Sequence, residues 1–316
     1  MISFRYHIVS IVSVFLALAV GVALGGGPLK GEVDNSLVEQ VEADRQVKAQ
    51  LQSEIADLRS GNAFTDDFAR TAAPGIVGGE LDGRPVTVVA LPGAQEVLVT
   101  ATADMVQQAG GNVAGIIRTG DGLVDPANKQ LVDELGSQLL DGTPDVTVDD
   151  EASGYERLGA LLARAVATDE DGGADVDDAA SSILSGLSTA GLMSPADDFT
   201  RRGSLVVFVS GPGGTSSDDK QGAGAIVAAL ARSVDAGSDG VVVAGPVTAA
   251  QQDGVVAGVR RDVVAARDVS TVDSLGRVAG QVVTVLALAE QGDGSVGHYG
   301  AEDAADGAMP GASTEE

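Results

Sequence analysis

An uncharged apolar run over residues 8–24 constrains this chain more than any other feature of its sequence. Between positions 8 and 27 the only polar side chains are those of Ser10 and Ser13, whose hydroxyl groups can bond back to helix carbonyls. A helix of about 20 residues is about 30 Å long, which matches the hydrocarbon core of a bilayer. We therefore predict a transmembrane anchor over residues 1–28.

The charges on either side of the run indicate its orientation. Arg5 and His7 precede it, and mixed acidic and basic residues follow it from Lys30 onward. Because basic residues favour the cytoplasmic side, we expect a single-pass protein with a cytoplasmic N-terminus and the remainder exported into the cell envelope. A cleaved signal peptide is the alternative, since Ala23 and Gly25 have cleavage-site spacing. The run is longer than a usual signal core, which favours retention.

Small residues recur at every fourth position of the anchor, at Ala17, Gly21 and Gly25. Such residues fall on one helix face, where two backbones can approach closely. This pattern predicts a helix-pairing face. Chance is the alternative explanation, because the whole chain is rich in Gly and Ala.

A heptad pattern follows the anchor. Alternate steps of three and four, counted back from residue 58, give apolar seam positions at Leu37, Val41, Leu51, Ile55 and Leu58. The polar seam positions Asp44 and Lys48 form an acid-before-lysine pair that can be satisfied along one helix, and polar seam residues can fix the register of a coiled coil.

These positions predict a coiled coil over residues 29–61. Because anchor and stalk both present pairing faces, we expect a homo-oligomer or a hetero-oligomer, with a parallel dimer as the simplest case. The alternative is an amphipathic helix that packs on its own domain.

The composition excludes several classes of function. The net charge of −27 repels phosphate backbones, and with six Phe, three Tyr and no Trp there are few platforms for base stacking. Nucleic acid is therefore not an expected partner. The absence of cysteine excludes disulfides, thiolate metal sites and thiol nucleophiles.

The rest of the chain predicts an α/β domain. Residues 62–84 are rich in glycine and read as a connector with a short helix near 64–70, and residues 301–316 are small and acidic, which predicts a disordered acidic tail over 299–316. Between them, over residues 85–298, continuous apolar runs alternate with helical patterns. Strands are expected at 86–91, 113–117, 205–209, 241–244 and 263–265, and helices at 96–108, 128–140, 155–166, 180–192, 222–233, 248–260 and 276–290.

Continuous apolar strands imply that both faces of the sheet are covered. We therefore expect a mostly parallel, doubly wound (Rossmann-like) sheet with helices on each side.

The candidate chemical motifs are weak. Glycine-proline turns follow three strands, at residues 91–94, 210–215 and 244–246, but the second lacks a dinucleotide fingerprint, so tight turns are favoured over nucleotide binding. Residues 169–178 have alternating aspartates but lack the closing Glu of a calcium loop, which favours an exposed charged loop. With His7 and His298 as the only histidines, we predict no catalytic, cofactor or metal-binding residue and no enzymatic activity.

Two stretches make the chain recognisable. Residues 1–10 with 15–25, and residues 269–279 with 286–290 and 297–300, together resemble the actinobacterial copper transporter family. The patch that carries the resemblance near the C-terminus comprises Ser270, Thr271, Asp273, Gly276 and Arg277. The plain alternative for this patch is a helix start, with Ser270 or Ser274 as the cap and Arg277 in solvent.

The resemblance implies a role in copper homeostasis or efflux across the cell envelope. Corynebacterial relatives imply an alternative, a non-enzymatic scaffold or regulator of cell division and cell-wall remodelling that acts through its coiled coil and α/β domain. The same relatives imply a membrane-bound division protein as a partner. One helix cannot enclose a pore, and the strands are of the buried type, so a single copy is not expected to form a channel.

Overall fold

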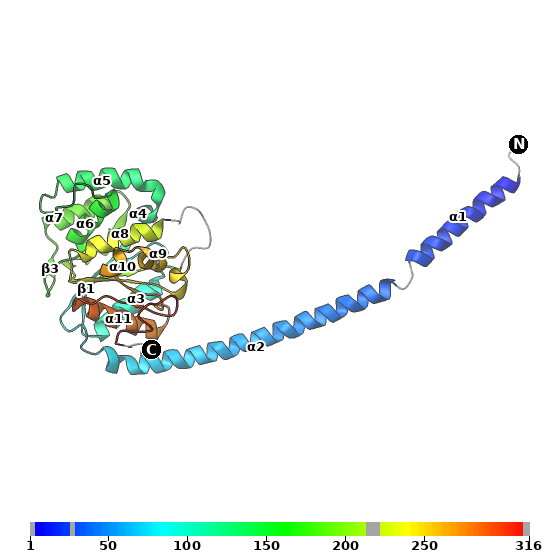
Figure 1. The fold of residues 1–316 in the computed structure, drawn as a ribbon, viewed down its shortest axis with the longest axis horizontal. Helices are drawn as coiled ribbons and strands as arrows, with labels where there is room; N and C mark the ends of the chain where they lie inside the picture. Colours follow the sequence, from blue (N-terminus) through cyan, green and yellow to red (C-terminus); the bar gives the residue numbers. More distant parts are fainter. Residues whose placement is uncertain (1–3, 26–28, 213–221, 312–316) are drawn as a thin grey trace. The chain divides into compact units, whose positions relative to one another are not determined.

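The computed structural model describes residues 4–25, 29–212 and 222–311, and the side chains of Phe4 and of residues 29–38 lie outside the described part. The chain divides into two compact units, residues 1–65 and 66–316. Figure 1 colours the chain along its sequence. The first unit contains helix α1 (Phe4–Gly25) and most of helix α2 (Leu29–Val77).

Helix α1 is the one described helix that is long and apolar enough to cross a membrane, over residues Arg5–Gly25. Its apolar side chains are exposed in the isolated chain. The length and composition are those predicted for a transmembrane anchor.

Helix α2 extends further than the sequence indicated. It continues through Gly61 and Pro74 to Val77, over most of the stretch expected to be a connector. A helical glycine costs only about 1 kcal/mol, and tertiary packing readily outweighs this cost. Ala73 and Val77 supply that packing, because both are buried in the core of the second unit.

A seven-stranded sheet forms the centre of the second unit, in the order β4-β2-β1-β6-β7-β8-β9. All neighbouring pairs are parallel except β2 with β4. The strands are β1 (Pro85–Ala90), β2 (Asn112–Thr119), β4 (Met193–Pro195), β6 (Leu205–Val209), β7 (Gly240–Ala244), β8 (Ser270–Val272) and β9 (His298–Tyr299). A small second sheet pairs β3 (Ala174–Asp175) with β5 (Arg201–Arg202). The prediction of a mostly parallel α/β sheet is confirmed.

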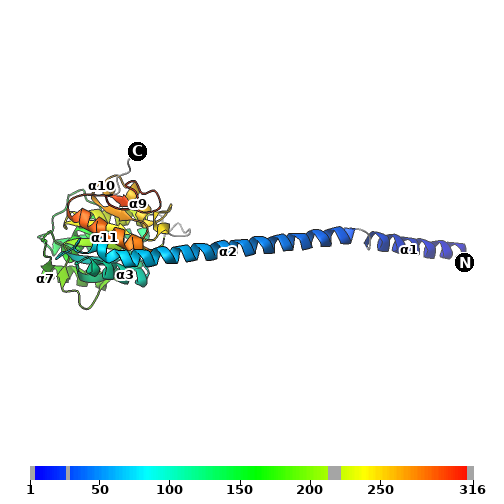
Figure 2. The same cartoon turned by 90° about the horizontal axis from the view of Figure 1, so that it is seen from below.

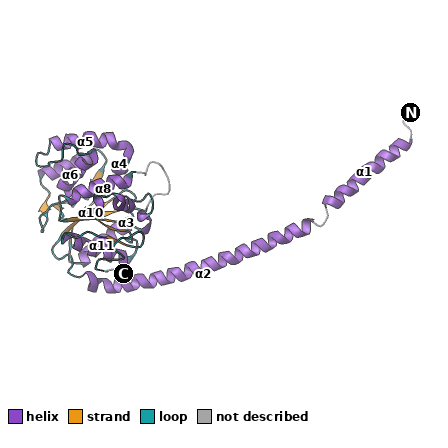
Figure 3. Ribbon diagram, in the orientation of Figure 1, coloured by secondary structure: helices purple, strands orange, loops and turns teal. Residues whose placement is uncertain are grey.

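Helices cover both faces of the sheet, which therefore lies between two cores (Figure 3). One face carries the C-terminal part of α2 with α3 (Glu96–Gln108) and α11 (Val278–Gly292), two helices that Figure 2 shows in front of the sheet. The other face carries α4 (Asp121–Val124), α5 (Lys129–Asp141), α6 (Gly154–Val166), α7 (Asp178–Thr189), α8 (Ala223–Asp235), α9 (Val255–Arg261) and α10 (Ala265–Asp268).

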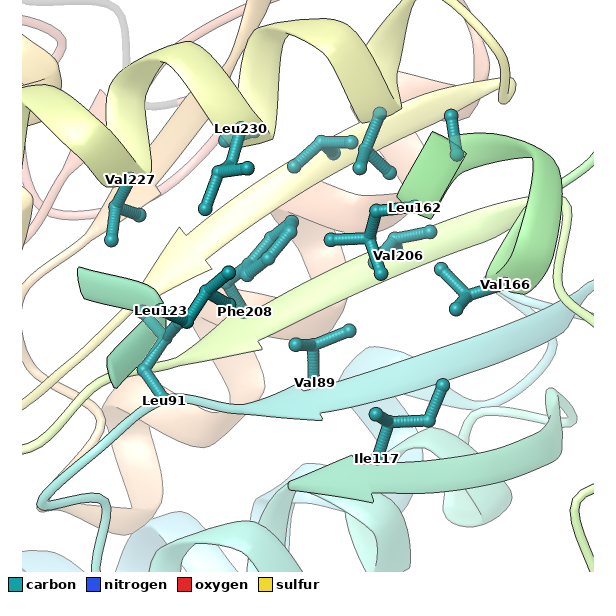
Figure 4. Close-up of a cluster of buried hydrophobic side chains, with 14 of the residues drawn as sticks. Val89, Leu91, Ile117, Leu123, Leu162, Val166, Val206, Phe208, Val227 and Leu230 are labelled. Atoms are coloured by element: carbon teal, nitrogen blue, oxygen red, sulfur yellow. The ribbon is translucent and has the colours of Figure 1, made fainter. Parts of the chain in front are cut away.

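The core between the sheet and helices α6 and α8 shows why the central strands appear in the sequence as continuous apolar runs. Leu162 of α6 and Leu230 of α8 lie over Val89, Val206 and Phe208 of the sheet, all almost completely buried (Figure 4). The alternate residues of the same strands, such as Val88 and Val207, enter the opposite core. Every residue of β1, β6 and β7 is thus buried on one side of the sheet or the other.

The region after β7 differs from the prediction of one helix over 248–260. It forms a short 3-10 helix η3 (Val247–Ala250), a turn in which the amide of Gly254 donates to the carbonyl of Gln251, and then α9. The predicted strand at 263–265 is also wrong, since Val263 and Val264 lie in an exposed turn and Ala265 begins α10. The strand is β8, which a search for apolar runs misses because two of its three residues are Ser270 and Thr271.

The C-terminal segment is folded where the sequence suggested a disordered tail. Tyr299 is buried in β9, and turns follow as far as residue 311. The amide of Gly300 donates to the carbonyl of Gly307 at 3.1 Å, and that of Asp306 to the carbonyl of His298 at 3.1 Å. The domain therefore continues past the expected boundary at residue 298.

Candidate functional site

The predicted helix-pairing residues Ala17, Gly21 and Gly25 all lie in α1. A side chain added at Gly21 or Gly25 would meet no atom within 4 Å. The face that they form is thus open in the isolated chain, and its role in pairing stays a prediction.

The apolar seam residues of the predicted coiled coil lie in α2, and those with described side chains are exposed. The exposed fractions are 47% for Val41, 52% for Leu51, 46% for Ile55 and 67% for Leu58. Leu37 also lies in α2, but its side chain is outside the described part. Among the described residues of the first unit, this stripe of large apolar side chains therefore has no covering partner.

A buried polar cluster lies at the carboxyl edge of the sheet, where β8 and β9 end. We call it the β8 cluster and define it by Arg260, Thr271, Asp273 and His298. The side chain of Asp273 is 0% exposed and that of Arg260 is 9% exposed, with 2.9 Å between Arg260 Nη1 and Asp273 Oδ2. This is a buried ion pair, whose partners must be hydrogen-bonded throughout to be tolerated.

The bonds around Asp273 satisfy that requirement. Its carboxylate also accepts from the amides of Ala301, at 2.6 Å, and Glu302, at 3.1 Å. Arg260 donates in addition to Thr271 Oγ1 and to the carbonyls of Tyr299 and Glu302. The cluster therefore fastens the segment after β9 to the end of β8.

His298 completes the cluster in its neutral form. Thr271 Oγ1 accepts from Arg260 Nε, so its own proton is free to donate to His298 Nδ1, 2.9 Å away. His298 Nε2 then donates to the carbonyl of Ala266 at 3.0 Å. Burial lowers the pKa of His298, and the positive charge of Arg260 acts in the same direction, although the Ala266 bond and Asp306 oppose it.

The patch at residues 270–277 runs from β8 to the start of α11, and neither Ser270 nor Ser274 caps that helix, so the predicted cap is wrong. Ser270 lies in β8, where it donates to the side chain of Gln291 and accepts from the amide of Gly297. Arg277 occupies the N-cap position of α11, and its Nε donates to Asp66 Oδ1 of α2 at 3.0 Å. Thr271, Asp273 and His298 could have been grouped only by knowing that β8 and β9 are neighbours in the sheet.

Gln291 links the patch to the opposite, amino edge of the sheet. Its Nε2 donates to the carbonyl of Asp268 at 2.6 Å and to Asp235 Oδ1 at 3.2 Å. Burial raises the pKa of Asp235 to about 6, and the charge of Asp268 adds to the shift, while the bond from Gln291 opposes it.

This shift predicts a pH-dependent gain from Asp235→Asn. The unfolded carboxyl titrates near 3.8, so the native state holds more protons between pH 3.8 and 6, and stability falls as the pH rises through that window. Above pH 6 the native chain bears the full cost of the charge. Because Asp235 is partly exposed, we expect the variant to be more stable by only about 1 kcal/mol at pH 7.5.

Urea denaturation of the full chain at pH 7.5 and pH 3.5 measures this effect. The gain should disappear at pH 3.5, and the exposed Asp253→Asn serves as the control at both values. An equal gain at both pH values would contradict a charge-based origin.

A crevice lies at the point where the sheet reverses its direction of winding. β1 and β6 are neighbours, and β1 leads into α3 on one face whereas β6 leads toward α8 on the other. Doubly wound sheets commonly bind ligands at such a point. The cavity there has a volume of about 440 Å³ and is lined by Leu91, Pro92, Gly93, Asp121, Val124, Asp125, Gly211, Pro212, Ala223, Val227, Asp253, Gly254 and Val255.

The described lining does not favour a nucleotide. Its charged side chains are Asp121, Asp125 and Asp253, which repel phosphate. Asp125 is already in use, because its Oδ1 accepts from the amide of Ala127 at 2.8 Å. Residues 213–221, which include the end of the glycine-rich turn at 210–215, lie outside the described residues.

The predicted acidic loop at residues 169–178 contributes side chains to the secondary structure of the domain. In the stretch 169–178, Asp175 lies in β3, and Asp177 caps α7 and accepts from Arg164 at 2.6 Å. The bond from Arg164 lowers the pKa of Asp177 to about 2. Across the described residues, no group of three or more His, Cys, Asp or Glu side chains is placed to hold a metal ion.

Comparison with known proteins places this architecture in a family. Residues 1–310 match the family model described as "Copper transport outer membrane protein, MctB". The proteins named Copper transporter MctB of Mycobacterium bovis and Mycobacterium tuberculosis are 30% identical to this chain over 307 residues, which cover 95% of the chain and 96% of each relative. The Mycobacterium leprae protein of the same name is 28% identical over 317 residues, with the same coverage. The chain therefore belongs to the MctB copper transport outer membrane protein family.

Proposed function

We propose that this protein acts in copper homeostasis or efflux at the cell envelope as a non-enzymatic, membrane-anchored component of an assembly. The observation that carries the proposal is the uncovered apolar seam of α2, which follows a single candidate span. One span encloses no pore, so transport requires further copies or partners. The copper part of the proposal rests on the family and on the names of the mycobacterial relatives.

The chemistry of the described residues supports an indirect role in copper handling. Copper(I) prefers thiolate and thioether ligands, and the sequence has no Cys and four Met. His298, the one histidine of the α/β domain, uses both ring nitrogens for contacts within the fold. We infer that copper is the cargo of the assembly and that this chain supplies anchoring and architecture.

We propose that the α/β domain is exported and that the N-terminus is cytoplasmic. The proposal rests on Arg5 and His7 before the span. A reporter fused after Glu316 tests it, since a phosphatase fused there should be active outside the cytoplasm. Activity of a cytoplasm-only reporter at the same position would overturn the orientation.

Deletion of the gene in its native host tests the copper role. We expect growth to become sensitive to copper and cell-associated copper to rise, with both restored by the native chain. A variant with Leu51→Lys and Ile55→Lys should fail to restore them, because charged residues in the seam oppose assembly. The control carries Ala49→Lys and Ser53→Lys, which add the same charge on the outer face of α2.

Two results would contradict this proposal separately. Unchanged copper tolerance in the deletion strain would remove the copper role. Full restoration by the seam variant would retain the copper role and remove the need for assembly.

The same observations favour a second candidate function, an envelope scaffold or regulator of cell division. The charged groups of the β8 cluster bind to one another and to backbone amides within the fold. The exposed feature is the apolar face of α2, which is suited to binding another protein. Chained or branched cells with normal copper tolerance in the deletion strain would support this function over the first.

A further inference from the structure

Three charged residues of α2, Asp44, Arg45 and Lys48, occupy the middle of the predicted seam. Asp44 and Lys48 are four residues apart in α2, yet they belong to no ion pair among the described residues, and the same holds for Arg45. Elsewhere the chain does form such local pairs, as between Lys129 and Asp133 at 2.5 Å. The charges at 44, 45 and 48 are thus available to a second chain.

These charges lie within the apolar seam. Val41 precedes them, Leu51 and Ile55 follow them, and all three apolar side chains are about half exposed. In heptad positions, Val41 is a, Asp44 is d, Arg45 is e and Lys48 is the next a. A charged layer at this point would be costly against a partner that offered only apolar residues there.

We propose that the partner of this seam is a second copy of the chain, aligned parallel and in register, and that Asp44, Arg45 and Lys48 fix that register. The inference rests on the assembly in the proposed function, and it names a second copy as the member that pairs with the seam. In a parallel coiled coil, a residue at d inserts into a hole formed by four residues of the facing helix. For Asp44 these are the partner's Val41, the partner's Asp44, the partner's Arg45 and the partner's Lys48.

Each carboxylate of such a dimer meets two cations, and the two-fold symmetry repeats the arrangement. A slip of one heptad would instead place Asp44 beside the partner's Leu51, which leaves a buried charge unpaired. The parallel direction follows from the membrane, because α2 begins within a few residues of the end of α1 in each copy. Two copies anchored in one membrane therefore start their stalks from the same side.

The absence of cysteine makes the alignment directly testable by disulfide formation. We expect full-length Leu51→Cys, in detergent or in membranes under mild oxidation, to form a disulfide-linked dimer, because facing d residues bring the two Cα atoms within disulfide range. Ala49→Cys, on the outer face, is the matched control and should cross-link at least about tenfold more slowly, equivalent to about 1.4 kcal/mol. When Leu51→Cys chains are mixed with Val41→Cys chains, the disulfide between positions 51 and 41 should form no faster than the disulfide between the two positions 51. An antiparallel pair would instead form the disulfide between positions 51 and 41 faster.

Charge reversal tests the register residues themselves. Asp44→Lys in the Leu51→Cys background should lower the cross-linking rate about tenfold, equivalent to about 1.4 kcal/mol, because two lysines then face four cations. Asp57→Lys, on the outer face, should not lower it. Mixing Asp44→Lys chains with chains carrying Arg45→Asp and Lys48→Asp should restore linkage, since every facing pair is then opposite in charge.

The outcomes separate this inference from the proposed function. Efficient linkage of Leu51→Cys that is insensitive to Asp44→Lys would overturn the role of the charges and leave self-association standing. Faster linkage between positions 51 and 41 would overturn the parallel alignment. A monomer in sedimentation, with no linkage at any seam position, would overturn both the inference and the self-association.

Discussion

Asp273→Ala lowers the free energy of unfolding of the full chain by about 3–5 kcal/mol, the largest effect that we expect from a single side chain. The substitution leaves the Arg260 guanidinium as a buried, unpaired charge, since its Nη1 lies 2.9 Å from Asp273 in a site with 0% exposure of the carboxylate. It also removes the acceptor for the amides of Ala301 and Glu302. Loss of one partner costs more than loss of the pair, because the remaining charge is not compensated.

Urea denaturation measures this loss, and hydrogen exchange should show faster exchange at residues 298–306. Arg261→Ala is the control, because Arg261 is the neighbouring arginine but is exposed and donates only to backbone carbonyls in the described bonds. A loss below 1 kcal/mol for Asp273→Ala would show that the ion pair does not hold the C-terminal segment.

Gly258→Val destabilises the chain by about 1–3 kcal/mol through overpacking. A β-carbon on Gly258 of α9 would lie 2.4 Å from the Cα of Gly224 in α8, and one on Gly224 would lie 2.8 Å from the Cα of Gly258. The two helices therefore meet through their backbones. A side chain at either position forces them apart, and the buried Val227 and Val259 nearby then lose contacts.

Gly136→Ala is the matched control, since its β-carbon would meet no atom closer than 3.7 Å in α5. Alanine also favours a helix over glycine, so this control should be neutral or slightly stabilising. Thermal unfolding of the full chain distinguishes the two variants. Equal melting temperatures for Gly258→Val and the native chain would mean that α8 and α9 can separate without cost.

The sheet was largely predictable because its strands are buried on both faces. β6 has the expected bounds, Leu205–Val209, and α3 has the expected bounds, Glu96–Gln108. In both segments, local preference and burial agree. The predicted secondary structure was wrong where tertiary contacts outweighed local preference. Polar residues form the strand β8, and α2 continues through glycine and proline.

The candidate functional features divide in the same way. The pattern of apolar residues alone indicated the span and the seam, since helical periodicity depends only on spacing along the chain. The β8 cluster gave no comparable signal, although two of its residues, Thr271 and Asp273, belong to the patch that carries the family resemblance.

The sequence by itself determined the span, the heptad seam, the parallel sheet and the family resemblance, because these depend on periodicity and composition. The tertiary structure decided that Arg260 meets Asp273, that His298 meets Thr271, and that Arg277 reaches Asp66. These partners are 13, 27 and 211 positions apart. Their contacts exist because β8 and β9 are neighbours in the sheet and because α2 packs on the same face as α11. No local spacing encodes that arrangement.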